Sequence, residues 1–181
     1  MSGPVVSPVP IFRPDMLPIY YFGGTDIAGN PSGVTNNNDN TIIFWKPYTC
    51  PGSGNKLVQE LSAMMYPTGG VTGIIRLGIY DSTGTTLLGQ GISSTSVIGT
   101  FDNWQGHMTP ASLSVNPLIL VGGTDYILAL TIGGITCYST HVDETRSNGS
   151  YNLTDYTGGL PAAVPSITGS YYMYPIRCGV I

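Results

Sequence analysis

Few residues in this sequence have the types and spacing that enzyme chemistry requires. The closest acid–base group is His141-Val142-Asp143-Glu144. On a strand, His141 and Asp143 would share one face, as a general base and the group that orients it would. No GxSxG sequence or other nucleophile motif accompanies them, and His107 stands alone. We therefore expect no catalytic residue, and we expect that the protein is not an enzyme.

Metal ligands are also sparse. The run Asn36, Asn37, Asn38, Asp39 and Asn40 offers oxygens of the kind that Ca²⁺ prefers, but it holds one carboxylate and does not match an EF-hand loop. Because asparagine favours turns, we expect a turn here rather than a Ca²⁺ site, and we expect no metal or cofactor.

Three cysteines, Cys50, Cys137 and Cys178, lack the close-spaced pairs of a zinc site. Cysteine is among the most buried residue types, so we expect small apolar core residues. A single disulfide between Cys137 and Cys178 is the alternative.

Aromatic side chains are better candidates for recognition. Flat apolar rings with polar tips can stack on sugar rings where several lie on one exposed face. Trp104 lies in the polar stretch TFDNWQG, which is typical of a loop. With Tyr151 and Tyr156 it forms the candidate carbohydrate-binding set. The competing interpretation is that most aromatic residues fill the core or a subunit interface.

The elements that must position these residues are strands. Gly-Gly and Pro-Gly pairs separate short apolar runs, as expected for strands joined by tight turns. The predicted strands cover 42–50, 57–66, 74–81, 87–93, 113–121, 126–132, 135–140 and 171–181. Residues 57–66 also show a helical stripe, but their alternation and the neighbouring strands favour a strand. About eight strands without a helix predict an all-β protein, an antiparallel two-sheet β-sandwich of jelly-roll type.

One stretch, GIIRLGIYDSTGTTLLGQG at 73–91, places an arginine inside an apolar strand. Alternation directs one face to the core and places Arg76 and Tyr80 on the other. We expect Arg76 to lie over a cross-strand acid or aromatic residue as a structural contact, outside any active site. The residues expected to be buried are Leu77, Ile79, Leu128 and Leu130.

The first 24 residues differ in composition from the rest. Prolines at positions 4, 8, 10, 14 and 18 remove backbone donors and fix φ too often for a helix or a central strand. We therefore predict an extended arm over 1–24 and a jelly-roll domain over 25–181. The arm is too apolar to remain solvated and is long enough to reach a neighbouring chain. Its candidate assembly residues are Val5, Val9, Ile11, Phe12, Met16, Leu17 and Tyr20.

Strands and turns between about residues 57 and 132 resemble a recurrent jelly-roll module. The likeness is carried by residues 75–81, the turn through Gly84, and residues 87–89, 118–121, 123–124 and 126–130. That module occurs in bacteriophage virion accessory proteins and in carbohydrate-binding or anchored extracellular proteins. Its motifs are core strands and turns, so the resemblance implies a fold more than a role. Ile127 stands where members of the family often carry a tryptophan, and we transfer no functional residue.

Composition narrows the classes of function. Charged residues make up 9% of the chain, and the six Lys and Arg are scattered, so we expect no nucleic-acid partner. No run approaches the ~20 apolar residues of a membrane span, and the N-terminus does not resemble a secretory signal, so we expect no membrane partner.

These features together favour a non-enzymatic virion structural protein. We expect a bacteriophage capsid decoration, head-fibre or tail accessory subunit, located in the virion and assembled in the host cytoplasm. Its expected partners are other virion proteins and copies of itself. The alternative is a carbohydrate-binding module or adhesin domain that binds cell-surface glycans.

Overall fold

The computed structural model describes residues 17–24, 35–37, 41–45, 47–64, 66–67, 71–97, 104–108, 113–133, 136–138, 147–152, 159–164 and 176–181. Every regular element in these ranges is a β-strand, which confirms the predicted all-β class. Residues 57–64 are part of a strand, as predicted, and do not form a helix. Within the same ranges, no helix is long and apolar enough to cross a membrane.

The described residues contain fourteen strands. They are β1 (Tyr20–Gly23), β2 (Thr35–Asn37), β3 (Thr41–Trp45), β4 (Tyr48–Thr49), β5 (Asn55–Met64), β6 (Tyr66–Pro67), β7 (Val71–Asp81), β8 (Leu87–Val97), β9 (Trp104–Met108), β10 (Ile119–Val121), β11 (Asp125–Gly133), β12 (Thr136–Tyr138), β13 (Ser147–Asn152) and β14 (Ile176–Val180).

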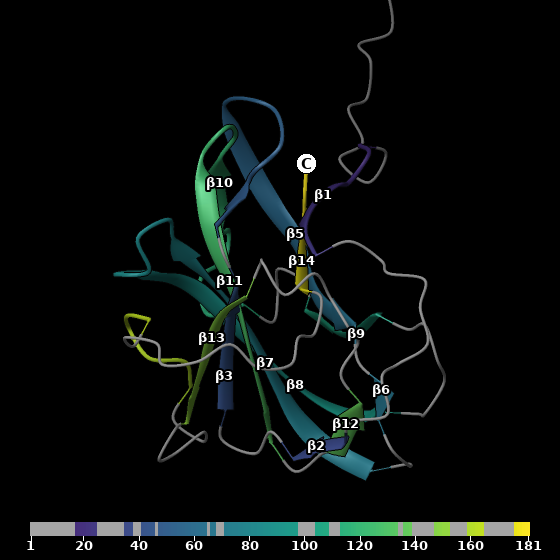
Figure 1. The fold of residues 1–181 in the computed structure, drawn as a ribbon. Helices are drawn as coiled ribbons and strands as arrows, with labels where there is room; N and C mark the ends of the chain where they lie inside the picture. Colours follow the sequence, from purple (N-terminus) through teal and green to yellow (C-terminus); the bar gives the residue numbers. More distant parts are fainter. Residues whose placement is uncertain are drawn as a thin grey trace, which may run out of the picture.

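Two antiparallel sheets carry most of these strands (Figure 1). The first has the order β1-β14-β5-β10, and β9 also pairs with β5. The second has the order β4-β11-β7-β8. Smaller sheets join β2, β12 and β6, and β13 with β3. This arrangement is compatible with a β-sandwich.

The two main sheets share an apolar core. In the second sheet, Leu77 and Ile79 of β7 lie opposite Leu130 and Leu128 of β11, and all four side chains are fully buried, as predicted. The first sheet contributes residues of β1, β5, β10 and β14 to the same cluster. Burying one such leucine stabilises a fold by roughly 1.5 to 3 kcal/mol, so this core is the main source of stability.

The opposite face of β7 and β11 is buried as well. Tyr80 and Ile127 form a second apolar cluster with Leu160 of the segment 159–164. The Tyr80 hydroxyl donates a hydrogen bond to the Pro161 carbonyl oxygen at 2.7 Å. Alternation placed Tyr80 on the face of β7 away from the main core, and a segment distant in the sequence covers it there.

Arg76 lies on this covered face, and 4% of the residue is exposed. Its partners in register are Thr131 on β11 and Ile92 on β8. Neither register partner is an acid or an aromatic residue, and the expected contact of the Arg76 side chain stays a prediction. Alternation identifies the face of a strand, whereas the sheet topology decides which residue lies opposite.

Long-range pairing also creates strands where the sequence indicated loops. Asn36 and Asn37, predicted to form a turn, belong to β2, because β12 supplies partners for their backbone groups. Trp104 begins β9, which pairs with β5, so the predicted loop at this position is also wrong. Of residues 113–121, Ile119–Val121 form a strand and Leu113 forms an isolated bridge to Gly91.

The turn after β7 is closed by Asp81. Its carboxylate accepts hydrogen bonds from the Thr83 hydroxyl at 2.9 Å, and from the Thr85 amide and hydroxyl at 2.9 and 3.0 Å. Desolvation raises the pKa of Asp81, but these hydrogen bonds, with a further one from Thr86, outweigh it and lower the pKa to about 2.

This turn should make the protein sensitive to acid. Because the pKa of Asp81 is lower in the folded chain than its ordinary value of 3.8, the folded state binds fewer protons in this range. The free energy that Asp81 contributes is present above pH ~4 and is lost as the pH falls toward ~2. Urea denaturation across this range should show a steeper loss of stability for the original chain than for Asp81→Asn. The same pH profile for both chains would contradict this account.

Candidate assembly surface

Strand β1 forms the edge of the first sheet, and it includes the end of the predicted arm. It pairs with β14 along its whole length, and the Gly24 amide donates to the Ile176 carbonyl oxygen at 2.7 Å. Phe22 points into the core, where its ring centroid lies 6.5 Å from that of Tyr126. The predicted arm over 1–24 thus ends in a strand that is anchored to the domain.

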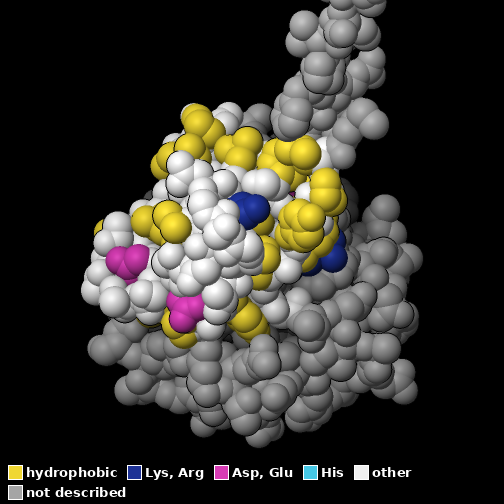
Figure 2. Space-filling view, turned by 90° about the horizontal axis from the view of Figure 1, so that it is seen from above, with side chains coloured by type: hydrophobic (Ala, Val, Ile, Leu, Met, Phe, Trp, Pro, Cys, Tyr) yellow, Lys and Arg dark blue, Asp and Glu magenta, His cyan; other side chains and the backbone are white. Residues whose placement is uncertain are grey.

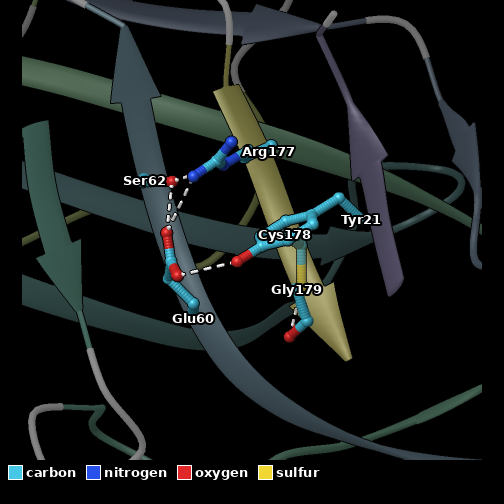
Figure 3. Close-up of polar contacts among 6 residues, drawn as sticks. All are labelled: Tyr21, Glu60, Ser62, Arg177, Cys178 and Gly179. Atoms are coloured by element: carbon cyan, nitrogen blue, oxygen red, sulfur yellow. Dashed lines mark hydrogen bonds and ion pairs between the residues drawn. The ribbon is translucent and has the colours of Figure 1, made fainter. Parts of the chain in front are cut away.

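On the outer face of the sheet, Tyr21 reaches across β14 to β5 (Figure 3). Gly179 of β14 lies beneath its ring, and a Cβ at that position would lie 2.9 Å from the Tyr21 ring. The missing side chain therefore lets the ring lie over the strand. The Tyr21 hydroxyl donates a hydrogen bond to Glu60 Oε2 at 3.1 Å. Burial, together with the nearby Glu60 carboxylate, raises the pKa of Tyr21, so the phenol stays protonated as a donor.

Arg177 joins this contact to a small polar network (Figure 3). Its guanidinium carbon lies 4.3 Å from the centroid of the Tyr21 ring, within range of a cation–π interaction. Arg177 Nε donates to Ser62 Oγ at 3.0 Å, and the Ser62 hydroxyl donates to Glu60 Oε1 at 2.8 Å. Arg177 Nη2 forms an ion pair with the same Glu60 oxygen at 3.4 Å. These contacts join β1, β14 and β5 through their side chains as well as their backbones.

Large apolar side chains remain exposed around this network (Figure 2). Figure 2 shows apolar groups spread over the end of the molecule at which β1 and β10 lie in Figure 1. Their exposed fractions lie between 38% and 53%. We call this group the apical surface, and it consists of Leu17, Ile19, Tyr20, Tyr21, Ile119 and Val121. Where exposed apolar side chains form a contiguous patch, that patch is a candidate site for binding a partner.

Two of the predicted assembly residues, Leu17 and Tyr20, belong to the apical surface. Lys56 from β5 also lies over the Tyr20 ring, with its Nζ 5.9 Å from the centroid. The other predicted assembly residues lie outside the described residues, and their role stays a prediction. They are Val5, Val9, Ile11, Phe12 and Met16.

The predicted carbohydrate-binding residues are divided among different parts of the fold. Trp104 lies on β9, which pairs with β5, whereas Tyr151 lies on β13, which pairs with β3. Their backbones therefore belong to different sheets. Tyr156 lies outside the described residues, as do His141, Asp143 and Glu144. Glycan binding stays a prediction.

The polar network was missed by sequence reasoning. Neither Glu60 nor Arg177 was among the candidate residues, although each is a charged residue on a strand of a chain with few charges. The small number of charged residues in the chain was the one signal that could have drawn attention to them. It could not identify the pair, because the two residues are 117 positions apart and meet only through the pairing of β14 with β5.

Cys50 and Cys178 are free and fully buried thiols. The prediction of small core residues is confirmed for these two, and the alternative disulfide between Cys137 and Cys178 is wrong. Phe22 and β5 surround Cys178 with apolar groups, which explains why this position suits a small apolar side chain. In the part of the chain that the structure describes, no group of three or more His, Cys, Asp or Glu residues could hold a metal ion.

Comparisons of the chain with protein-family models, curated proteins and solved structures found no match. Function is therefore inferred from the chemistry of the apical surface. Its exposed apolar side chains lie beside the polar network of Tyr21, Glu60, Ser62 and Arg177.

Proposed function

We propose that the protein is a non-enzymatic structural subunit of a bacteriophage virion. In this proposal it is a capsid decoration, head-fibre or tail accessory subunit of jelly-roll type, anchored through its N-terminal segment. The observation that carries the proposal is the exposed apolar surface at the point where this segment joins the first sheet. Leu17, Ile19 and Tyr20 lie there, directly after the proline-rich residues 1–16. An apolar surface beside an apolar segment favours burial against other chains.

Strand β1 connects the N-terminal segment firmly to the domain. Phe22 is buried in the core and Tyr21 is bound to Glu60, so a partner that holds the residues before Leu17 also holds the domain. The low content of charged residues, 9%, further suits a surface that neighbours cover. The proposed partners are other virion proteins and copies of this chain. The choice of a virion follows from the resemblance of residues 57–132 to a module that phage accessory proteins share.

A chain that begins at Leu17 should keep its fold and lose its attachment. It retains β1 and the core residue Phe22, but it lacks the apolar proline-rich segment that we propose is held by neighbours. Circular dichroism would follow the fold, and sedimentation with particles of the virus would follow attachment. A shortened chain that still sediments with the particles would overturn the anchoring role.

Two point variants test whether attachment depends on the apical surface or on any exposed apolar residue. Ile119→Ser changes the apical surface, whereas Val115→Ser changes a similarly exposed residue in the turn before β10. We expect attachment to weaken about tenfold in the first variant, as for the loss of one apolar interface contact, and to change little in the second. Equal effects of the two would argue against this surface.

A further inference from the structure

Strand β1 occupies a docking site that the rest of the domain builds. Phe22 packs beside Tyr126 of β11, and the strand pairs with β14. Tyr21 binds Glu60 of β5 and lies over Gly179. As far as the described residues extend, the groups that receive β1 all come from positions 48 or later in the chain. The site therefore recognises the side chains of β1, whichever chain supplies them.

The connection that follows β1 is long enough to reach another molecule. Ten residues, 25–34, separate Gly24 from Thr35. Fully extended, ten residues span about 33 to 36 Å. The radius of gyration of a domain of this length is roughly 16 Å. The same connection can thus place β1 on its own domain or on an adjacent copy.

We propose that β1 is exchanged between copies of this chain when they assemble. Tyr20–Gly23 of one copy would pair with β14 of a second copy, and Phe22 would fill the same site in that copy's core. This inference rests on the proposed assembly function and names the partner as a second copy. Exchange keeps every contact of β1, so it is a low-cost route to association. The apical surface adds a driving force, because two joined copies can bury apolar side chains that one copy exposes.

The register of β1 on β14 gives a direct test. Tyr20 lies opposite Val180, so a thiol at each position would be within reach of a disulfide. Full-length Tyr20→Cys and Val180→Cys chains are unfolded together, refolded together and oxidised. Neither chain carries both introduced thiols, so a disulfide between the paired positions 20 and 180 requires β1 to cross to the other copy, and chance contacts give the background that the control pair measures. We expect about tenfold more covalent heterodimer than from the control pair, because only paired positions are held together.

The control pair is Val121→Cys with Val180→Cys. Val121 is about as exposed as Tyr20, but it lies on β10 and is paired with Asn55. The original chain mixed with each variant gives the background from the native cysteines. A double variant, Tyr20→Cys with Val180→Cys, checks that the register allows the bond within one chain.

Absence of excess heterodimer, with the bond closed in the double variant, would overturn the exchange. If that bond does not close, light scattering of the original chain refolded at high concentration decides. A dimer that persists on dilution and is lost in Phe22→Ala supports exchange, whereas a monomer alone overturns it. Such a failure leaves the anchoring role standing, because that role is tested separately by particle binding of the chain that begins at Leu17.

Discussion

Replacing Gly23 by alanine is expected to detach β1 and to lower the free energy of unfolding by about 3 to 5 kcal/mol, the usual cost of losing a buried phenylalanine. A Cβ at Gly23 would overlap the Ile176 carbonyl oxygen and would lie 2.8 Å from Leu128 Cδ1. Gly23 also has a φ of 120°, which residues with a side chain rarely adopt. Because the overlap involves backbone of β14, the strand must move, and Phe22 then leaves the core.

Gly54→Ala is the matched control for this change. Gly54 also has a positive φ, of 72°, but a Cβ there would have nothing within 4 Å. This variant should lose only the backbone term, about 1 kcal/mol. Urea denaturation of both variants, with Phe22→Ala as a reference for a lost core contact, measures the difference. Equal losses for Gly23→Ala and Gly54→Ala would show that close packing of β1 on β14 is unimportant.

Replacing Leu128 by alanine should cost about 2 to 5 kcal/mol, as for other buried leucines. Leu128 is fully buried between the two main sheets, opposite Ile79 of β7. Truncation leaves a cavity that the rigid strands on either side can fill only in part. Val121→Ala, at a residue that is 49% exposed, should cost far less. Chemical denaturation provides the comparison, and similar losses for the two would mean that the core is misassigned.

The losses in free energy of unfolding caused by Gly23→Ala and Leu128→Ala should not be additive in the double variant. Leu128 Cδ1 is one of the atoms that an alanine at position 23 would meet, so Leu128→Ala removes part of that clash. The Ile176 carbonyl oxygen remains in place, so the double variant should still lose β1. A double-mutant cycle based on denaturation gives the coupling directly.

The parts of the fold that could be predicted are those governed by alternation and turn residues. Leu77, Ile79, Leu128 and Leu130 follow a period of two between clear turns, and all four are buried. The strand over 57–64 followed from the same pattern, supported by its neighbours. Such local signals are strong because one face of each strand must be apolar.

The remaining features depend on pairing over long distances, which no local pattern contains. Tyr20–Gly23 follow a proline and have an irregular pattern, yet they form a strand because β14 offers an open edge. Alternation placed Tyr80 on the face of its strand away from the main core, but it could not show that the segment 159–164 covers this face. In both cases the partner lies about 80 or more residues away in the chain.

The candidate surface was likewise predictable only in part. The high apolar content around the prolines selected Leu17 and Tyr20 as candidate assembly residues, and both are exposed in the single chain; their role in assembly stays a prediction. Ile119 and Val121 were predicted only as part of a strand, and their exposure depends on β10 lying at the other edge of the first sheet. An exposed edge cannot be recognised before the order of the strands is known.

Cys178 of β14 lies opposite Phe22 of β1 in register, and its thiol is buried in the shared core. Burial, reinforced by the neighbouring Cys50 thiol and Glu60 carboxylate, raises the pKa of Cys178 well above its ordinary value. Alkylating reagents react with the thiolate, so the Cys178 sulfur is inert for as long as β1 stays paired with β14. The exchange proposed above requires β1 to leave β14, and that step would remove the protection. The rate at which an alkylating reagent labels Cys178 therefore measures how often β1 separates from this edge of the sheet.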